Sequence, residues 1–267
     1  MRVEKVSIRH EYVGPICEEL DNKCMAKGDP QIYSMVGPEE YDYELPESKN
    51  PYVYLMYNDK DQLIAYLGYV AIDDNNIEMC ITVDPDYRRQ KIATNLFLRL
   101  VAEYETKSFS IAIDPDNTTA KHFLEKIGFT YSSTEAAMQL SKEDFSFDAE
   151  PIELKSENYI SENDENMIPQ TIYPSNTLKI TGIVDGEEVG YLYISYAEVC
   201  FALFDIEIKE NYREMGYGNR LLQTALKDAF KHANTVVLHV SSNNIPAINL
   251  YQKIGFKTSQ KVDMYEL

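Results

Sequence analysis

The chain lacks the cysteine patterns and the long apolar segments that mark several protein classes. Its four cysteines form no C-x-x-C pair, and its four histidines stand at no metal-ligand spacing beside them, so neither a zinc site nor a disulfide framework is expected. No apolar run approaches the roughly 18 residues of a membrane helix, and the first residues hold no apolar signal-peptide core. We therefore expect a cytoplasmic protein with no metal and no membrane partner.

Basic residues are also scarce. The chain has 25 lysines and arginines against 44 acidic residues, which gives a formal net charge of −19. Nucleic-acid binders present a basic stripe, so nucleic acid is not an expected partner. The acidity fits plain solubility, and it also favours a cationic substrate over an anionic one. The G-x-S-x-G and G-x-G-x-x-G motifs of hydrolases and dehydrogenases are both absent.

What the chain does contain is an internal repeat. Its 267 residues allow two domains of about 100–150 residues, and the halves match at an offset of about 125 residues. Tyr87-Arg88 then aligns with Tyr212-Arg213. The pattern of each half predicts a hairpin, a strand, a tight turn, an amphipathic helix, another strand and a second helix, in this order. A polar, acidic segment at 141–151 suggests domains at 1–147 and 148–267.

Local signals set the predicted element boundaries. Asn117 and Asn244 are expected to cap the second helix of each half, and Gly128 and Gly255 to end it. The hairpins are predicted to join residues 53–56 to 63–70 and residues 178–184 to 189–195. One apolar stripe is predicted on the first helix of each half: Ile92, Leu96, Phe97, Leu100 and Val101, then Leu221, Leu222, Ala225, Leu226 and Ala229.

The turn into the first helix of the second half carries the clearest functional signal. Residues 213–218 read R-x-x-G-x-G after a strand. A glycine-bearing turn that opens a helix directs several backbone N–H groups to one point, where the helix dipole also favours negative charge. This pattern predicts a pyrophosphate cradle.

These motifs resemble those of the GNAT superfamily of acyl-CoA-dependent N-acyltransferases, whose R/Q-x-x-G-x-G/A segment holds the coenzyme A pyrophosphate. The later N-x-x-A-x-x-x-Y-x-x-x-G-F run from Asn244 to Phe256 is similar to that family's second hallmark. The resemblance implies an α/β (α+β) fold of two GNAT-like domains, each with a mixed, mostly antiparallel twisted sheet flanked by helices. It implies acetyl-CoA as co-substrate, held by Ile206, Ile208, Arg213, Glu214, Met215, Gly216, Tyr217, Gly218, Asn244 and Ala247.

The two halves differ at positions that matter to this resemblance. Lys91 stands where the second half has Gly216, and Leu124 stands where it has Tyr251. The lysine would crowd the cradle or would itself contact a phosphate. Leucine removes a phenolic proton donor. We therefore expect a degenerate N-terminal domain and a catalytic C-terminal domain, with the opposite assignment as the alternative.

The resemblance gives Tyr251 the role of protonating the departing CoA thiolate, or of donating a hydrogen bond to its sulfur. The alternative is an amphipathic tyrosine that only caps the core. Strand alternation predicts that Asp205 and Glu207 share one face, opposite Phe204, Ile206 and Ile208. The two carboxylates would accept the proton of an amine, or they would form a solvent-facing stripe. Glu78 is the corresponding candidate of the first half.

The expected activity is N-acetyl transfer by direct attack of a primary amine, from a small molecule or a peptide, on acetyl-CoA. The alternative is a non-catalytic acyl-CoA sensor. Tyr33, Tyr41 and Tyr43 would line an acceptor pocket or would belong to a mobile acidic loop. The expected assembly is a monomer, as a pseudo-dimer of two domains, or a homodimer.

Overall fold

A computed structural model of the protein describes residues 1–30, 32, 51–72, 74–104, 107–158, 177–196 and 201–267. The chain forms two compact units, unit 1 (Met1–Ser133 with Val262–Leu267) and unit 2 (Thr134–Lys261). Each unit is a mixed α/β structure, as the sequence predicts. No described helix is long and apolar enough to cross a membrane.

The elements of unit 1 are β1 (Arg2–Ser7), α1 (Val13–Ala26), β2 (Tyr52–Tyr57), β3 (Leu63–Ala71), β4 (Asn76–Val83), the 3₁₀ turn η2 (Pro85–Tyr87), α2 (Ile92–Glu103), β5 (Ser108–Ile113) and α3 (Thr118–Lys126). From β2 to α3 these elements follow the predicted order, and they are preceded by β1 and α1, which the sequence analysis does not predict. The strand order is β1-β2-β3-β4-β5-β12, in which only β4 and β5 are parallel.

Unit 2 repeats this plan. Its elements are β7 (Glu153–Asn158), β8 (Thr177–Val184), β9 (Glu187–Tyr196), β10 (Phe201–Ile208), the 3₁₀ turn η4 (Glu210–Tyr212), α4 (Tyr217–Ala229), β11 (Thr235–Ser241) and α5 (Ile245–Ile254). The strand order is β6-β11-β10-β9-β8-β7, and only β10 and β11 are parallel.

The last strand of each repeat pairs with a strand of the other repeat. β6 (Thr130–Ser141) follows α3 but pairs with β11, where Ser141 lies opposite Thr235. β12 (Lys257–Glu266) follows α5 but pairs with β5. Each of these two strands is divided between the units. The compact units therefore divide after Ser133, and the predicted boundary at 147/148 lies within unit 2.

The segment that the sequence suggested as a linker packs along α4. The ring of Phe145 lies 5.1 Å from that of Phe230, and the Lys227 ammonium lies 4.5 Å from the ring centre of Phe147. The buried Gln223 side chain accepts a hydrogen bond from the backbone N–H of Asp148 (2.9 Å). This stretch is therefore part of the packed structure of unit 2.

Most of the local signals hold in the structure. The second predicted hairpin turns at Asp185-Gly186, whose two consecutive positive φ values, 51° and 81°, suit a tight two-residue turn. Asn117 and Asn244 cap α3 and α5 through their side chains, and Gly128 and Gly255 follow these helices with positive φ. The predicted helix stripes are buried, except that Val101 is only partly so.

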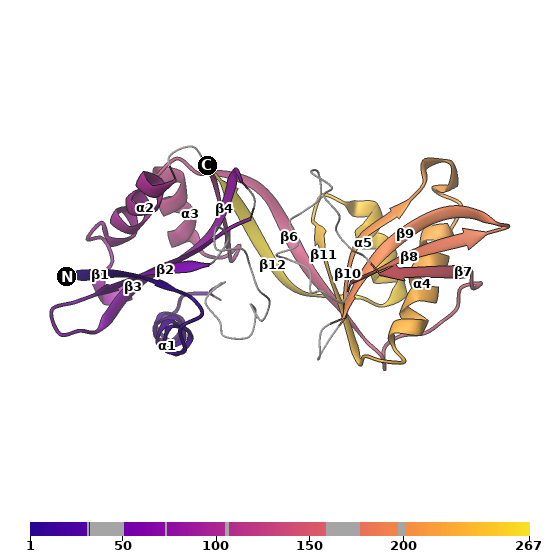
Figure 1. Cartoon of the computed structure of the whole chain (residues 1–267), viewed down its shortest axis with the longest axis horizontal. Coiled ribbons are helices and arrows are strands. Elements are labelled where there is room, and N and C mark those ends of the chain that lie inside the picture. Colours follow the sequence, from indigo (N-terminus) through magenta and orange to yellow (C-terminus); the bar gives the residue numbers. More distant parts are fainter. Residues whose placement is uncertain (31, 33–50, 73, 105–106, 159–176, 197–200) are drawn as a thin grey trace. The chain divides into compact units, whose positions relative to one another are not determined.

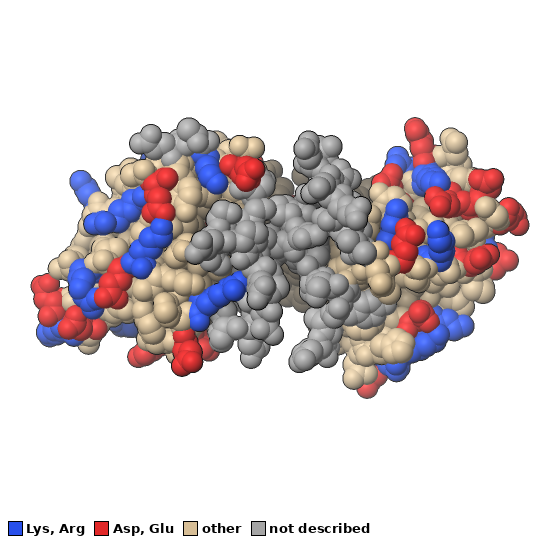
Figure 2. Space-filling view, in the orientation of Figure 1, with Lys and Arg blue, Asp and Glu red and all other residues tan. Residues whose placement is uncertain are grey.

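The helices cover the two sheets differently. In unit 1, α2 and α3 pack on one face and α1 packs on the other (Figure 1). In unit 2, α4 and α5 cover one face, and no described helix lies on the opposite face. Figure 2 shows acidic and basic side chains interspersed over the described surface of the face drawn, without a continuous basic patch.

Candidate functional site

The two parallel strands of each unit part from one another before the predicted cradle. In unit 2, β10 pairs with β11 only from Phe201 to Leu203 but continues to Ile208. In unit 1, β4 pairs with β5 only up to Met79 but continues to Val83. Beyond these points, the backbone amide and carbonyl groups on this side of the strand are not bonded to the parallel neighbour, so they can bond an inserted ligand.

A β-bulge lies where β10 parts from β11. Phe204 pairs with Tyr193 and Glu207 pairs with Tyr191, so two residues of β10 oppose one residue of β9. Asp205 has a φ of 46°, in the left-handed region. The prediction of uninterrupted alternation is therefore wrong, because the extra residue brings Glu207 to the face that carries Phe204. β3 and β4 of unit 1 pair without such a break.

Gly190 on β9 is the sequence signal for this bulge. It pairs with Ile208, whereas at the same place in unit 1 Ala65 pairs with Val83. A Cβ atom built on Gly190 would lie 2.3 Å from the backbone oxygen of Glu207. A glycine inside a strand often marks a close backbone approach of this kind.

We expect Gly190→Ala to lower the free energy of unfolding by about 1–3 kcal/mol, because the methyl group has to displace backbone rather than a side chain. Urea unfolding followed by circular dichroism measures this. Gly218→Ala is the matched control, since a Cβ there meets its nearest side chains at 3.5 Å. A Gly190→Ala protein as stable as the control would show that the bulge does not depend on the close approach.

The predicted cradle forms between η4 and α4. Glu214 and Gly216 have positive φ values of 62° and 82°, and Arg213 Nε donates a hydrogen bond to the backbone oxygen of Ile208 (2.9 Å). No side chain caps the start of α4, so the N–H groups of its first turn remain available. A Cβ built on Gly216 meets no described atom within 4 Å. Open space therefore borders this helix terminus.

The corresponding loop of unit 1 has the same backbone. Arg89 and Lys91 have φ values of 64° and 61°, and Arg88 Nε donates to the backbone oxygen of Val83 (3.0 Å). Lys91 thus adopts the conformation for which glycine is usually needed, at some cost in strain. The substitution at this position changes the side chain and leaves the loop geometry unchanged.

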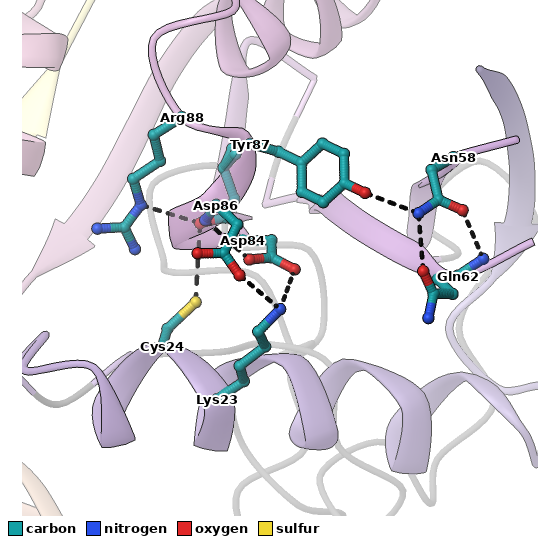
Figure 3. A network of polar contacts seen from close by, with 9 residues as sticks. Lys23, Cys24, Asn58, Gln62, Asp84, Asp86, Tyr87 and Arg88 are labelled. Carbon is teal, nitrogen blue, oxygen red and sulfur yellow. Dashed lines mark hydrogen bonds and ion pairs between the residues drawn. The ribbon is translucent and has the colours of Figure 1, made fainter. Parts of the chain in front are cut away.

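Carboxylates pair with the basic side chains at the start of the unit 1 loop, and Figure 3 shows two of them, Asp84 and Asp86, beside Lys23. The Arg88 guanidinium is paired with both carboxylate oxygens of Asp29, and Lys23 on α1 pairs with the buried Asp84 (2.6 Å) and with Asp86 (3.4 Å). Arg213 of unit 2 has no ion pair among the described residues. The ion pair with Asp29 neutralises the Arg88 guanidinium, so Arg88 is less available to a pyrophosphate than Arg213 is.

The residues at the rim of the cradle also differ between the two units. Met215 and Ile245 are 62% and 55% exposed at the starts of α4 and α5, whereas unit 1 exposes Gln90 and Thr118 at these places. These two side chains give the cradle of unit 2 an apolar rim.

Tyr251 lies on α5 in the core of unit 2. Its side chain is 7% exposed and its ring lies 5.9 Å from that of Phe256. Burial raises its pKa, so the phenol stays protonated at neutral pH. The hydroxyl makes no hydrogen bond to the described residues. Leu124, its counterpart in unit 1, is fully buried.

The other predicted contact residues have mixed positions. Ile206 and Ile208 pack against the core, the Tyr217 ring contacts that of Tyr212 at 5.7 Å, and Asn244 accepts the backbone N–H of Ala247 (3.2 Å) as a helix cap. Glu78 lies half-buried on β4 opposite Val70. Tyr33, Tyr41 and Tyr43 lie outside the described residues.

His239 is a further candidate residue that no sequence motif indicates. It follows Leu238, the last residue of β11 that pairs with β10, and it faces away from α4 and α5 because Leu238 and Val240 belong to the core. Burial lowers its pKa, against an opposing effect of Glu135, so a large share of the imidazole is neutral at pH 7. His239 belongs to no sequence motif, and it becomes a candidate only because it lies where β10 and β11 part. Within the described residues, no group of three His, Cys, Asp or Glu could hold a metal.

A sequence model of the Acetyltransferase (GNAT) family matches residues 19–129 and again residues 135–256. The chain belongs to the GNAT acetyltransferase family. The two matches make it a tandem GNAT protein, with one family copy in each repeat.

Curated proteins resemble part of this GNAT chain. An N-alpha-acetyltransferase from Sulfurisphaera tokodaii is 40% identical over 90 residues, which cover 28% of this chain and 53% of that protein. A mycothiol acetyltransferase from Corynebacterium glutamicum is 31% identical over 85 residues, which cover 31% of this chain and 29% of that protein. The chain therefore aligns with about half or less of each relative.

Solved GNAT structures resemble the whole chain in fold. A GCN5-related N-acetyltransferase from Sphaerobacter thermophilus superposes with a TM-score of 0.73 at 13% identity, covering 99% of this chain and 95% of that one. A tandem GNAT protein from the clavulanic acid biosynthesis pathway gives a TM-score of 0.66 at 13% identity, covering 100% and 98%. At 13% sequence identity, these two comparisons show a similarity of fold.

Proposed function

We propose that unit 2 transfers an acetyl group from acetyl-CoA to a primary amine. The open cradle at Gly216 carries this proposal, because a side chain there would occupy space that no described atom fills. Three further features belong to unit 2 alone: the bulge at Asp205, the phenol of Tyr251 and the apolar rim. Unit 1 keeps the loop backbone but has none of these features.

The cradle suits the pyrophosphate of acetyl-CoA. Uncapped N–H groups at the start of α4 and the helix dipole favour a negatively charged group. The Arg213 guanidinium has no described carboxylate partner to repel phosphate. Backbone groups of β10 beyond Leu203 are free of β11, which would let them bond the rest of the co-substrate.

The proposed reaction is a direct attack. The amine nitrogen forms a bond to the thioester carbonyl carbon, the carbon–sulfur bond breaks, and CoA leaves as thiolate. Asp205 or Glu207 accepts the proton that the amine loses, with His239 as a third candidate from the structure. Although the Asp205 side chain is exposed, partial desolvation of its carboxylate raises its pKa, which makes it a better proton acceptor. Tyr251 protonates the departing thiolate.

Calorimetric titration of acetyl-CoA into the full chain tests the co-substrate site. We expect Gly216→Glu to weaken binding by at least about 10²-fold, because it sets a carboxylate near the pyrophosphate at a partly screened site. The unit 1 loop shows that a side chain is compatible with this backbone, so the variant should fold.

Lys91→Glu is the matched control, since it places the same charge at the equivalent position of unit 1. It should bind acetyl-CoA as the wild type does. The reverse result, with binding lost in Lys91→Glu and kept in Gly216→Glu, would assign the co-substrate to unit 1. Thiol release on adding amines then separates an enzyme from an acyl-CoA sensor, which binds without releasing thiol.

A further inference from the structure

The face of the unit 2 sheet that lies opposite α4 and α5 carries a continuous row of aromatic, acidic and hydroxyl groups. Leu192 and Ile194 belong to the core, so the alternate residues of β9 face the other way. On β10, Phe204 contacts Tyr193 and Glu207 contacts Tyr191, so these two residues belong to the same row. We call it the acceptor face, and it consists of Tyr191, Tyr193, Ser195, Phe204 and Glu207.

Cross-strand contacts hold these side chains in place. The ring of Phe204 stacks on that of Tyr193 at 5.5 Å and an interplanar angle of 9°, and Tyr191 meets Tyr193 edge-on at 5.6 Å. Tyr191 Oη donates a hydrogen bond to Glu207 Oε2 (2.6 Å). The bulge makes this pairing possible, because without it Glu207 would face α4.

One end of the acceptor face attracts cations. The Glu207 carboxylate lies on this face, and the neighbouring carboxylate of Asp205 at the bulge is close enough to help raise the pKa of Tyr191. The Lys179 ammonium already lies 4.9 Å from the ring centre of Tyr191, which shows that these rings accept a cation. A primary ammonium group would find both a negative charge and aromatic rings here.

The other end holds an unsatisfied hydroxyl. Ser195 is 2% exposed, and its Oγ makes no hydrogen bond to the residues that the structure describes. Buried hydroxyl groups are rarely left unbonded, because the loss of water is not repaid. Ser195 shares the face of Tyr193, and it pairs with the small residue Ala202 on β10. A bound molecule with a hydrogen-bonding group would satisfy this hydroxyl.

The distance between the two ends sets the length of such a molecule. Ser195 and Tyr191 are four residues apart on β9, which is about 13 Å along a strand. The stacked rings of the buried Tyr193 and the half-buried Phe204 lie between them and form an apolar middle section. An aminopropanol-sized compound is too short to reach both ends.

We propose that the acceptor is an elongated primary ammonium compound that lies along the acceptor face, with its ammonium group at Asp205 and Glu207, an apolar middle against Tyr193 and Phe204, and a hydrogen-bonding group at Ser195. This proposal rests on the proposed function of unit 2, and it narrows the acceptor from any amine to this class.

Amine binding tests the proposal independently of turnover. Aminooctanol, octylamine and aminopropanol are titrated calorimetrically into the full chain with CoA present. We expect aminooctanol to bind at least about 10-fold more tightly than aminopropanol, because only the longer compound reaches both ends. Ser195→Ala should weaken aminooctanol binding by about 3–10-fold, the usual effect of one hydrogen bond, and leave octylamine within about 2-fold. Ser156→Ala, at an exposed serine of β7, is the matched control and should change neither.

The outcomes separate the two proposals. Equal binding of the long and short amino alcohols, or an equal effect of Ser195→Ala on aminooctanol and octylamine, overturns the acceptor assignment. If these amines bind as expected but acetyl-CoA does not bind or releases no thiol, the acceptor face stands and acetyl transfer fails. If thiol is released with no preference among the amines, acetyl transfer stands and the acceptor assignment fails.

Discussion

Replacing Tyr251 by phenylalanine is expected to lower kcat by about 10²–10⁴-fold, the usual contribution of a positioned general acid. The substitution removes only the hydroxyl. The ring keeps its place in the core, where it contacts Phe256, and no hydrogen bond to the described residues is lost. Acetyl-CoA affinity should therefore remain within a few-fold of the wild type, because the loss concerns the departing thiolate rather than the bound thioester.

Two measurements distinguish this role from a packing role. Tyr265→Phe, at another buried tyrosine whose pKa burial also raises, should leave kcat unchanged. Single-turnover acetyl transfer at several pH values should show no alkaline decline that belongs to Tyr251 near neutral pH, since its raised pKa keeps it protonated. Full turnover in Tyr251→Phe would remove the general-acid assignment.

The features that the sequence predicted correctly depend on neighbours along the chain. Asn244 caps α5 and Gly255 ends it through local backbone geometry, and the apolar stripe of α4 follows the helical period. The cradle loop also depends on only a few consecutive residues, and its backbone is the same in both units. Such features can be predicted because the residues that determine them are adjacent in sequence.

The bulge and the strand exchange depend on distant residues. The position of Glu207 depends on Gly190, which lies on another strand, so strand alternation within 203–208 gave the wrong face. The pairing of β6 with β11 and of β12 with β5 joins strands that are distant in sequence. A local pattern that is the same in both repeats cannot predict which sheet each of these strands joins. His239 likewise gains its interest only from the end of the β10–β11 pairing.

The stability of unit 1 is expected to fall as pH rises through about 6, because of Asp21. This α1 residue is 6% exposed, and it accepts hydrogen bonds from Tyr66 Oη (2.7 and 2.8 Å) and Thr82 Oγ1 (2.9 Å). Burial raises its pKa from 3.8 to about 6, although the two hydroxyl bonds act in the opposite direction. Burial is the larger effect because a dry carboxylate loses most of its hydration.

The sign follows from proton binding. Between about pH 4 and 6 the folded protein holds the Asp21 proton more tightly than the unfolded chain does, so this contribution is complete at the acid end and is lost as pH rises. The change from 3.8 to about 6 corresponds to about 3 kcal/mol. Urea unfolding of the wild type and of Asp21→Asn between about pH 4 and 7 measures it, and the difference between the two proteins isolates Asp21 from other carboxylates. A difference that does not change with pH would contradict the assignment.

The same titration bears on which unit holds the co-substrate. Asp21 bonds to Thr82, which lies on β4 two residues before Asp84 and the unit 1 loop. If acetyl-CoA bound at unit 1, loosening α1 by ionising Asp21 would alter its affinity, and Asp21→Asn would remove that pH dependence. Because we place the co-substrate at Gly216 in unit 2, we expect acetyl-CoA affinity to be the same in Asp21→Asn and wild type at every pH, while their stabilities diverge.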